Sequence, residues 1–260
     1  MSGKSLLLLF LLVNSIYTEQ ISRCANGLAT YFSASDRGNC GLGLILKSVN
    51  IAAAPTDLYK GSMACGVCYE VFGEKGTITV MITDKCPTCE KTSSKGRIHL
   101  DIDKRVFPKI DEKKKGKVPV SLRMVPCNVS GNIKLVIHET NNYYWNAYVI
   151  NSKIGIKGME LQFDNGSWKK TDRSTANRFI LKKIKKFKKL SVKIIGFSGE
   201  EILCYQNQSK IKKGTYDCGK QFRVDKFFDI FSLSETNKKD MKSECCKKPS
   251  LISNSNACKV

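Results

Sequence analysis

The sequence has few acidic residues, and it lacks a long hydrophobic run after its first residues. Its 260 residues include 44 Lys or Arg but only 23 Asp or Glu, which gives a formal net charge of +21. The apolar run at 6–13 is too short to span a bilayer and no later run is long enough, so no transmembrane helix is expected, and a signal anchor is the less favoured alternative. A surface with so little negative charge attracts polyanions. The densest basic cluster, at 182–189, is interpreted as a solvated strand face followed by a turn rather than as a specific site.

The first residues predict a secretory signal peptide. Lys4 gives a positive start, an apolar run follows, and Ser15 and Thr18 are candidate last residues before cleavage. We therefore expect residues 1–18 to be removed and the mature chain to be secreted and extracellular. For a secreted protein, acidic polysaccharide, anionic matrix and phospholipid are nearer partners than nucleic acid. Three Asn-x-Ser glycosylation acceptors agree with this route: Asn128, Asn165 and Asn207.

Strand-like runs and cysteine content divide the rest of the chain. Residues 19–127 hold seven of the twelve cysteines and strand-like runs at 76–84, 97–103 and 117–127, which predict an all-β barrel or sandwich. Residues 128–205 carry four further runs and an Asn165-Gly166 hairpin turn, and they predict a small β-sandwich. Residues 206–260 hold Cys218, Cys245, Cys246 and Cys258, and form either a disulfide-tied appendage or a partly disordered tail.

Two Cys-x-x-Cys pairs allow a metal site or disulfides. Cys65 and Cys68 are separated by seventeen residues from Cys86 and Cys89, which matches the zinc-ribbon spacing. Such a zinc ribbon would imply a nucleic-acid binder. An oxidising secretory route favours disulfides instead. Disulfides are the preferred interpretation, with no metal and no cofactor expected.

The stretch GRIHLDIDKRVF, at 96–107, places three titratable groups at alternate positions. On a strand, His99, Asp101 and Asp103 share one face, and the intervening Leu100 and Ile102 share the other. Asp103 also suits the N-cap of a short helix that begins at 104, which Pro108 limits to a turn or two. Asp101 is thus a candidate acid or binding group.

Six short motifs, in order, resemble the expansin family, including its members outside plants. They are ATYF at 29–32, GNCGLG at 38–43, ACGVCYEV at 64–71, ITDKCP at 82–87, HLDID at 99–103 and RMVPC at 123–127. The runs GNIKLVIHE and YYWNAYVI follow and resemble the start of the family's second domain. The resemblance covers about two-thirds of the chain and ends near residue 205.

The resemblance implies a fold and a disulfide set. The fold is a six-stranded double-psi β-barrel followed by an immunoglobulin-like, carbohydrate-binding β-sandwich, here with a cysteine-containing C-terminal tail. The implied disulfides are Cys40–Cys65, Cys68–Cys127 and Cys86–Cys89. Cys24, Cys204 and the four tail cysteines then remain, an even number whose pairing cannot be deduced.

The resemblance also implies a polysaccharide groove in the first domain. Thr30, Asp84 and Asp101 match the family's polar groove residues, and His99 matches its plant-type His-x-Asp pattern. Asp101 is the position that serves as general acid in related hydrolases of this fold, whereas Asp84 could instead anchor a turn and His99 could support Asp101. Hydrolysis needs a second carboxylate, and only Asp36 lies near the expected position.

In the second domain, the resemblance implies an aromatic platform for glucan rings. Tyr144 and Trp145 match two of three stacking aromatics, and Ala176 replaces the third. A regular strand sends these neighbours to opposite faces, so a bulge must intervene or one of them is core. His138 stands where the family has a basic residue, and Cys86 stands where bacterial relatives have an aromatic near the groove aspartate.

Three functions follow from these residues. The first is a secreted, non-enzymatic protein that binds wall or matrix polysaccharide, cellulose or a related glucan, and loosens it without hydrolysis. The second is an endoglucanase-like glycosidase with Asp101 as general acid and Asp36 or Asp84 as partner. The third is a purely structural polysaccharide-binding matrix protein. The lysine-rich surface extends the candidate partners to acidic polysaccharide.

Overall fold

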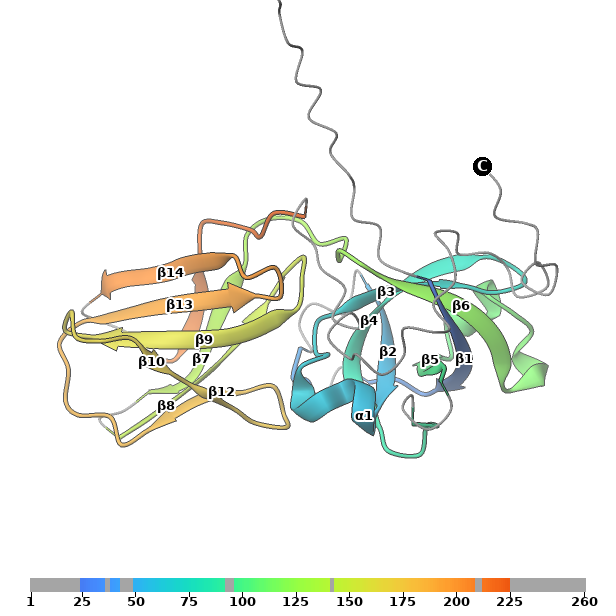
Figure 1. Ribbon diagram of the computed structural model, residues 1–260, viewed down its shortest axis with the longest axis horizontal. Helices are drawn as coiled ribbons and strands as arrows, with labels where there is room; N and C mark the ends of the chain where they lie inside the picture. The colour runs from blue at the N-terminus through green and yellow to red at the C-terminus, as the bar shows by residue number, and fades with distance from the viewer. Residues whose placement is uncertain are drawn as a thin grey trace, which may run out of the picture.

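The computed structural model describes residues 24–35, 38–42, 49–91, 96–140, 143–208 and 212–224. The predicted signal peptide, Asp36 and the cysteines at 245, 246 and 258 lie outside the described residues. Two β-rich domains lie side by side in the described part of the chain (Figure 1). No helix in this part has the length and apolar character needed to cross a membrane.

The first domain is a closed barrel of six strands in the order β1-β5-β2-β4-β3-β6. The strands are β1 (Ala25–Phe32), β2 (Asn50–Pro55), β3 (Cys68–Phe72), β4 (Thr77–Cys86), β5 (Ile98–Asp103) and β6 (Val118–Val125). Two pairs, β1 with β5 and β2 with β4, are parallel, and the other neighbours are antiparallel. The domain is the expected double-psi β-barrel. Short helices connect its strands: α1 (Thr56–Tyr59), η2 (Lys60–Ser62), η3 (Phe107–Lys109) and η4 (Lys113–Lys115).

Alternation along β5 fills the barrel core from one face only. Leu100 and Ile102 are fully buried, and they join fully buried side chains from β4 and β6 such as Ile82 and Leu122. Burying such apolar side chains contributes roughly 1.5–3 kcal/mol each. Because β5 is thus fixed in register, its polar residues, Asp101 among them, lie on the outer face of the barrel wall.

The second domain is a β-sandwich of two sheets. One sheet has the order β10-β9-β13-β14 and the other β11-β12-β8-β7-β15. The strands are β7 (Lys134–Thr140), β8 (Tyr144–Ile150), β9 (Ile156–Phe163), β10 (Lys169–Lys170), β11 (Asp172–Arg173), β12 (Phe179–Lys182), β13 (Leu190–Gly196), β14 (Glu201–Gln208) and β15 (Gly214–Asp217). The expected hairpin joins β9 to β10, and its turn places Asp164 and Asn165 in the left-handed region, at φ 47° and 61°.

The sandwich extends past residue 205, where its boundary was predicted. Strand β15 pairs with β7, Cys218 forms a disulfide with Cys204, and Phe222 is only 2% exposed. The resemblance did not reach this segment, so sequence patterns alone left it in the tail. The described part of that tail is therefore an edge strand of the second domain and a disulfide anchor.

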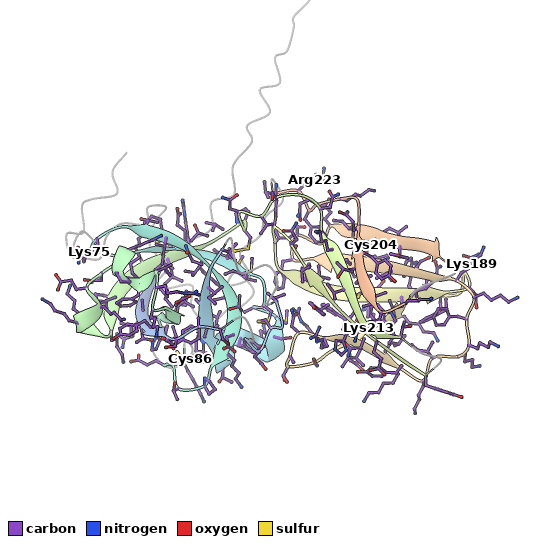
Figure 2. All side chains as sticks on the ribbon, turned by 180° about the vertical axis from the view of Figure 1, so that it is seen from behind. Lys75, Cys86, Lys189, Cys204, Lys213 and Arg223 are labelled. Atoms are coloured by element: carbon purple, nitrogen blue, oxygen red, sulfur yellow. A yellow bond between two sulfur atoms is a disulfide. The ribbon has the colours of Figure 1, made fainter. Side chains whose placement is uncertain are left out.

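The three disulfides that the resemblance implies are present in the barrel. Cys40–Cys65, Cys68–Cys127 and Cys86–Cys89 are all bonded. The two Cys-x-x-Cys pairs therefore do not meet as four thiolates, and the zinc-ribbon alternative is wrong. Figure 2 places Cys86 on the barrel and Cys204 on the sandwich.

Candidate functional site

Three polar residues of β5 face outward, but they differ in what they can offer a ligand. His99 and Asp103 are only 4% and 3% exposed, whereas Asp101 is partly exposed. Asp103 accepts hydrogen bonds from the backbone N–H of Arg105 and from its Nε, at 2.9 and 2.7 Å. Asp101 is therefore the β5 residue whose carboxylate can reach a bound molecule.

The predicted helix cap at Asp103 is a turn cap instead. The residues after β5 form a turn, and the next helix, η3, begins at Phe107 with Val106 as its N-cap residue. The Asp103 carboxylate binds the N–H two residues ahead, which is the geometry of an Asx-turn. Burial raises the pKa of Asp103, but the hydrogen bonds from Arg105 outweigh this and hold the pKa below its ordinary value.

A directed chain of hydrogen bonds ends on Asp101. Strand β1 places Thr30 opposite Asp101, and Thr30 Oγ1 donates to Asp101 Oδ1 at 2.6 Å. Thr30 Oγ1 also lies 3.1 Å from His99 Nε2, while the backbone N–H of Glu90 donates to His99 Nδ1 at 2.9 Å. Because Nδ1 accepts, the ring proton of neutral His99 resides on Nε2 and is donated to Thr30. The hydroxyl proton of Thr30 is then committed to Asp101.

Burial sets the protonation states in this chain. Desolvation raises the pKa of Asp101, and the Thr30 hydrogen bond and nearby His99 offset this only in part. Desolvation lowers the pKa of His99, and Lys117 adds to that effect while Glu90 and Asp101 oppose it. His99 is therefore held neutral and serves Asp101 as a positioning group, in keeping with the supporting role weighed from the sequence.

The neighbouring Glu90 is fixed from the opposite side. Its carboxylate pairs with Arg97 at 2.8 Å and with Lys117 at 3.0 Å. These hydrogen bonds, from Arg97 first and Lys117 second, lower the pKa of Glu90 to about 2. These two ion pairs hold Glu90 in place, and its backbone N–H donates to His99 Nδ1 and so orients the ring.

The Cys86–Cys89 disulfide adjoins Asp101. Both sulfurs and one Asp101 oxygen lie within 4.8 Å of one another, although a bonded pair of sulfurs offers no thiolate to a metal. The two half-cystines form a small apolar cluster with Ala53, which is opposite Asp101 on β2, and with Phe32. This cluster stands beside the carboxylate where bacterial relatives were expected to have an aromatic residue.

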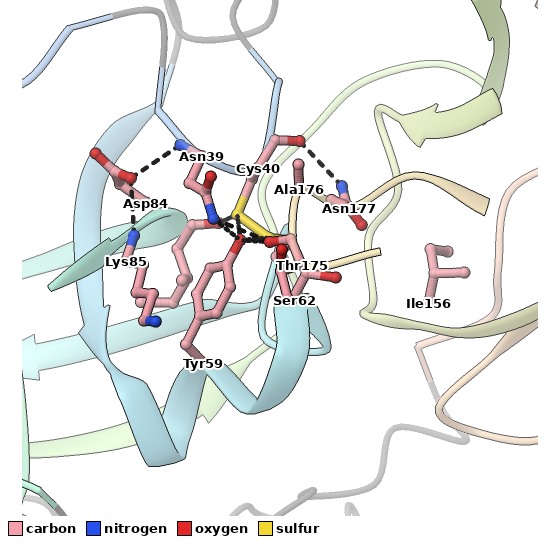
Figure 3. Close-up of a disulfide and its surroundings, with 12 residues drawn as sticks. Asn39, Cys40, Tyr59, Ser62, Asp84, Lys85, Ile156, Thr175, Ala176 and Asn177 are labelled. Atoms are coloured by element: carbon pink, nitrogen blue, oxygen red, sulfur yellow. Dashed lines mark hydrogen bonds between the residues drawn. A yellow bond between two sulfur atoms is a disulfide. The ribbon is translucent and has the colours of Figure 1, made fainter. Parts of the chain in front are cut away.

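Asp84 holds together a turn and a loop. Its Oδ1 accepts from the backbone N–H of Asn39 and of Lys85, both at 2.8 Å (Figure 3). The loop packs so closely on β4 that a Cβ at Gly38 would lie 2.4 Å from the Thr83 carbonyl oxygen. Asp84 is thus an anchor in this structure, which is one of the two roles considered for it.

The same loop joins the two domains. The Asn39 amide donates to Tyr59 Oη and to the Thr175 carbonyl, both at 2.9 Å, and Tyr59 Oη donates to the same carbonyl at 2.7 Å (Figure 3). Burial raises the pKa of Tyr59, so the phenol remains a donor at neutral pH. These contacts join the barrel loop that Asp84 anchors to the segment of the sandwich that holds Ala176.

A second group of contacts reinforces this junction. Arg173 donates to Ser62 Oγ, to the Ile156 carbonyl and to Asn177 Oδ1, at 3.0, 2.5 and 2.7 Å. The Asn177 amide in turn donates to the Cys40 carbonyl at 3.2 Å. Burial lowers the pKa of Arg173 to about 10, so the guanidinium remains charged at neutral pH.

The aromatic platform of the second domain differs from the expectation. Trp145 is fully buried in the sandwich core, so its assignment as a stacking residue is wrong. On β8, Trp145 points inward, whereas Tyr144 and Tyr148 are partly exposed on the other face. The preceding Tyr143 is 77% exposed, the largest value among the large hydrophobic side chains of the described chain. Tyr143, directly before β8, is therefore the most exposed aromatic residue here, and Tyr144 is the partly exposed one that follows it.

The sequence prediction did not include Tyr143, because the family resemblance pointed to Tyr144 and Trp145. Strand alternation indicates that Tyr144 and Trp145 cannot both reach the surface of a regular strand, and the structure shows that Trp145 is the core residue. Ala176, in place of the third aromatic, is partly exposed, and the neighbouring Arg178 guanidinium stacks 4.0 Å from the Tyr148 ring centre. His138 is exposed at a bulge in β7.

Two of the three predicted glycosylation acceptors, Asn128 and Asn165, have exposed side chains. Asn207 lies on β14, and its side chain is outside the described residues. These positions stay predictions.

This chain is similar to known proteins in both sequence and fold. Residues 1–122 match the expansin N-terminal domain. Expansin-like protein 2 of Dictyostelium discoideum is 33% identical over 175 residues, which cover 64% of this chain and 42% of that protein. Expansin-B3 of Arabidopsis thaliana is 29% identical over 139 residues, covering 46% of this chain and 51% of that protein. This chain is therefore similar to expansins, and the similarity to the N-terminal domain of that family extends over residues 1–122.

A bacterial expansin shares the fold across both domains. The expansin of Clavibacter michiganensis superposes with a TM-score of 0.68 at 22% identity, over 77% of this chain and 98% of that one. A mutant of that bacterial expansin has been solved in complex with cellohexaose. The chain spans about half the length of the curated relatives that it matches.

Proposed function

We propose that this chain is an expansin-like, extracellular, non-enzymatic protein that binds wall or matrix glucan and loosens it without hydrolysis. The observation that carries the proposal is the hydrogen-bond chain from His99 through Thr30 to Asp101. It occupies Oδ1 of Asp101, and no donor among the described residues contacts Oδ2. An oriented carboxylate oxygen of this kind is a suitable acceptor for a sugar hydroxyl.

The glucan surface of the proposal has two parts. Asp101 and Thr30, with His99 behind them, form the polar part on the barrel. Tyr143 and Tyr144 form the aromatic part on the sandwich, since flat aromatic faces suit the CH faces of pyranose rings. The cellohexaose complex of the bacterial expansin supports a glucan as ligand for this fold. Secretion is supported by the predicted signal peptide and by four described disulfides.

A chemical argument favours binding over hydrolysis. Inverting and retaining glycosidases both need a second carboxylate at a defined distance from the acid. Among the described candidate carboxylates, Asp84 already accepts two backbone N–H groups and Asp103 is paired with Arg105. Asp36, the other candidate, lies outside the described residues, and an assay of reducing-sugar release tests it together with the rest. Loosening instead requires only that hydrogen bonds from protein to hydroxyl groups replace those between neighbouring glucan chains.

One observation favours the glycosidase as a second candidate. Burial raises the pKa of Asp101, as it does for the general acid of glycosidases. Release of reducing sugars from glucans by the wild type, abolished in Asp101→Asn, would select this candidate over the first. Because Asn keeps the size of the side chain, that variant separates loss of charge from loss of packing.

The deciding experiment is a creep assay on isolated walls under constant load. The wild type is expected to extend the wall with no release of reducing sugar, and Asp101→Asn is expected to lose most of the extension. Retained creep in Asp101→Asn would refute the role given to Asp101. Retention on polysaccharide with no creep by the wild type would favour the structural matrix protein.

A matched pair of aromatic variants tests the platform. Tyr143→Ala changes an exposed side chain, so it should weaken retention on cellulose with less than about 0.5 kcal/mol of stability lost. Trp145→Ala leaves a cavity in the sandwich core and should lower the unfolding free energy by about 3–5 kcal/mol. Unchanged retention in the folded Tyr143→Ala variant would remove Tyr143 from the glucan surface.

A further inference from the structure

The lysine segment, residues 182–189, is a fixed element of the sandwich. It links β12 to β13 and contains six exposed lysines: Lys182, Lys183, Lys185, Lys186, Lys188 and Lys189. Figure 2 shows Lys189 at the end of the sandwich that lies away from the barrel. The sequence alone predicted a solvated strand face and turn here, with no particular geometry.

Apolar side chains at every third position hold the lysine segment on the core. Ile184 is 4% exposed, Leu190 is fully buried, and the ring of Phe187 packs 4.9 Å from that of Phe163. Asp164 Oδ1 also accepts the backbone N–H groups of residues 188 and 189, at 2.9 and 2.8 Å. The lysines between these anchors consequently project into solvent from a defined backbone.

The positive charge of the lysine segment is not neutralised within the described chain. None of its six ammonium groups lies within 4.0 Å of a carboxylate in the described residues. On the other sheet of the same domain, Lys193 pairs with Glu160 and Glu201 at 3.4 and 3.0 Å. Like charges held this close repel one another, and a polyanion removes that repulsion when it binds.

The lysine segment is continuous with the exposed tyrosines. Lys182 is directly opposite Tyr144 in the β12–β8 pairing, and the N–H of Ile184 donates to the carbonyl of Tyr143 at 3.4 Å. Arg178 directly precedes β12 and stacks on Tyr148, which lies on the same face of β8 as Tyr144. Tyr144, Tyr148, Arg178 and Lys182 therefore lie on one face of this sheet, and Tyr143 directly precedes that strand.

We infer that the lysine segment and the tyrosine pair together bind an anionic, carboxylate-bearing polysaccharide. Sugar rings stack on Tyr143 and Tyr144, and uronate carboxylates along the same polymer pair with the lysines. Lysine suits this role because its ammonium group is a point charge on a flexible side chain. It can pair with carboxylates that recur along a polymer without the fixed bidentate geometry of an arginine. The inference deepens the proposed function, because it names the class of polymer for the sandwich part of that surface.

The test compares two polymers that differ in charge alone. Polygalacturonate and its fully methyl-esterified form share a backbone, but only the first carries carboxylates. We expect full-length protein to bind polygalacturonate tightly at low salt, to lose most of that binding at 1 M NaCl, and to bind the ester weakly. Equal binding of both polymers would overturn the inference.

A matched pair of charge variants locates the site. The triple variant changes Lys182, Lys185 and Lys186 to Gln and should weaken polygalacturonate binding about ten-fold. Each exposed ion pair contributes several tenths of a kcal/mol, and the loss of three adds up to that factor. The control changes three exposed lysines elsewhere, Lys75, Lys109 and Lys220, to Gln and alters net charge equally. Equal losses in both variants would show a non-specific charge effect and overturn the inference.

Two further measurements keep the inference apart from the proposed function. Retention on cellulose should survive the lysine changes, because neutral glucan offers them no charge. Loss of creep in Asp101→Asn with polygalacturonate binding intact would support both proposals, whereas creep without any lysine-dependent binding would sink only the inference. Tighter lysine-dependent binding to anionic phospholipid vesicles or to single-stranded DNA than to polygalacturonate would also overturn it.

Discussion

Thr30 supplies the sharpest test of the site, because one hydroxyl serves two partners. Replacing Thr30 by Val keeps the shape of the side chain but removes the donor to Asp101 and the acceptor for His99. Both partners are at least partly buried, so each loses a hydrogen bond that water replaces poorly. Leaving such groups unpaired costs about 1–3 kcal/mol of unfolding free energy.

The cost should depend on pH with a definite sign. Loss of the Thr30 donor removes a contribution that lowers the pKa of Asp101, so that pKa should rise further above its ordinary value. The folded state then binds more protons than the unfolded state from about pH 4 upward. The unfolding free energy of Thr30→Val should therefore fall more steeply with rising pH than that of the wild type.

Two measurements and one control decide the matter. Urea unfolding between pH 4 and pH 8 gives the stability difference, and the carboxyl ¹³C shift of Asp101 gives its pKa. Thr30→Ser retains the hydroxyl and should preserve the Asp101 pKa at a cost of about 1 kcal/mol for the lost methyl group. If Thr30→Val behaved like Thr30→Ser in both measurements, the hydrogen-bond chain to Asp101 would be refuted.

Three further predictions concern stability. Replacing Cys68 and Cys127 by Ser opens a loop with a sequence separation of 59 and should cost about 4 kcal/mol in denaturant unfolding, and a loss below 1 kcal/mol would contradict this. Because the folded-state pKa of His99 is lowered, its contribution to stability is present above about pH 6.5 and is lost as pH falls. His99→Gln should therefore flatten the dependence of unfolding free energy on pH between about pH 7 and 5, and a slope equal to that of the wild type would contradict this. Tyr59→Phe should lower unfolding free energy by about 1–3 kcal/mol through the domain junction, measured by calorimetry, and an unchanged melting temperature would show that the junction adds no stability.

Local alternation predicted the groove better than it predicted the platform. The pattern of β5 placed Leu100 and Ile102 in the core and Asp101 on the outer face, because period two is fixed by strand geometry. At Tyr144 and Trp145, the same rule showed that only one could be exposed, but not which one. That choice depends on which face of the sheet the second sheet of the sandwich covers.

Other features depend on contacts that the sequence does not display. Asn39 and Thr175 are 136 positions apart, and the hydrogen bond between them follows from packing of one domain on the other. The hydrogen-bonded order of His99, Thr30 and Asp101 likewise depends on the parallel register of β1 with β5. The disulfide set followed from family resemblance, because spacing alone also allowed a zinc ribbon.

The hydrogen bonds at the domain junction have a mechanical consequence. Asn39, Tyr59 and Arg173 connect the two domains through directional contacts on both sides of the Cys40–Cys65 disulfide. In the proposed function, a polymer bound at Asp101 and at the tyrosine pair would contact two domains whose relative motion these hydrogen bonds restrict. In that function, thermal motion of the connected domains would therefore exert torque and tension on the bound polymer strand.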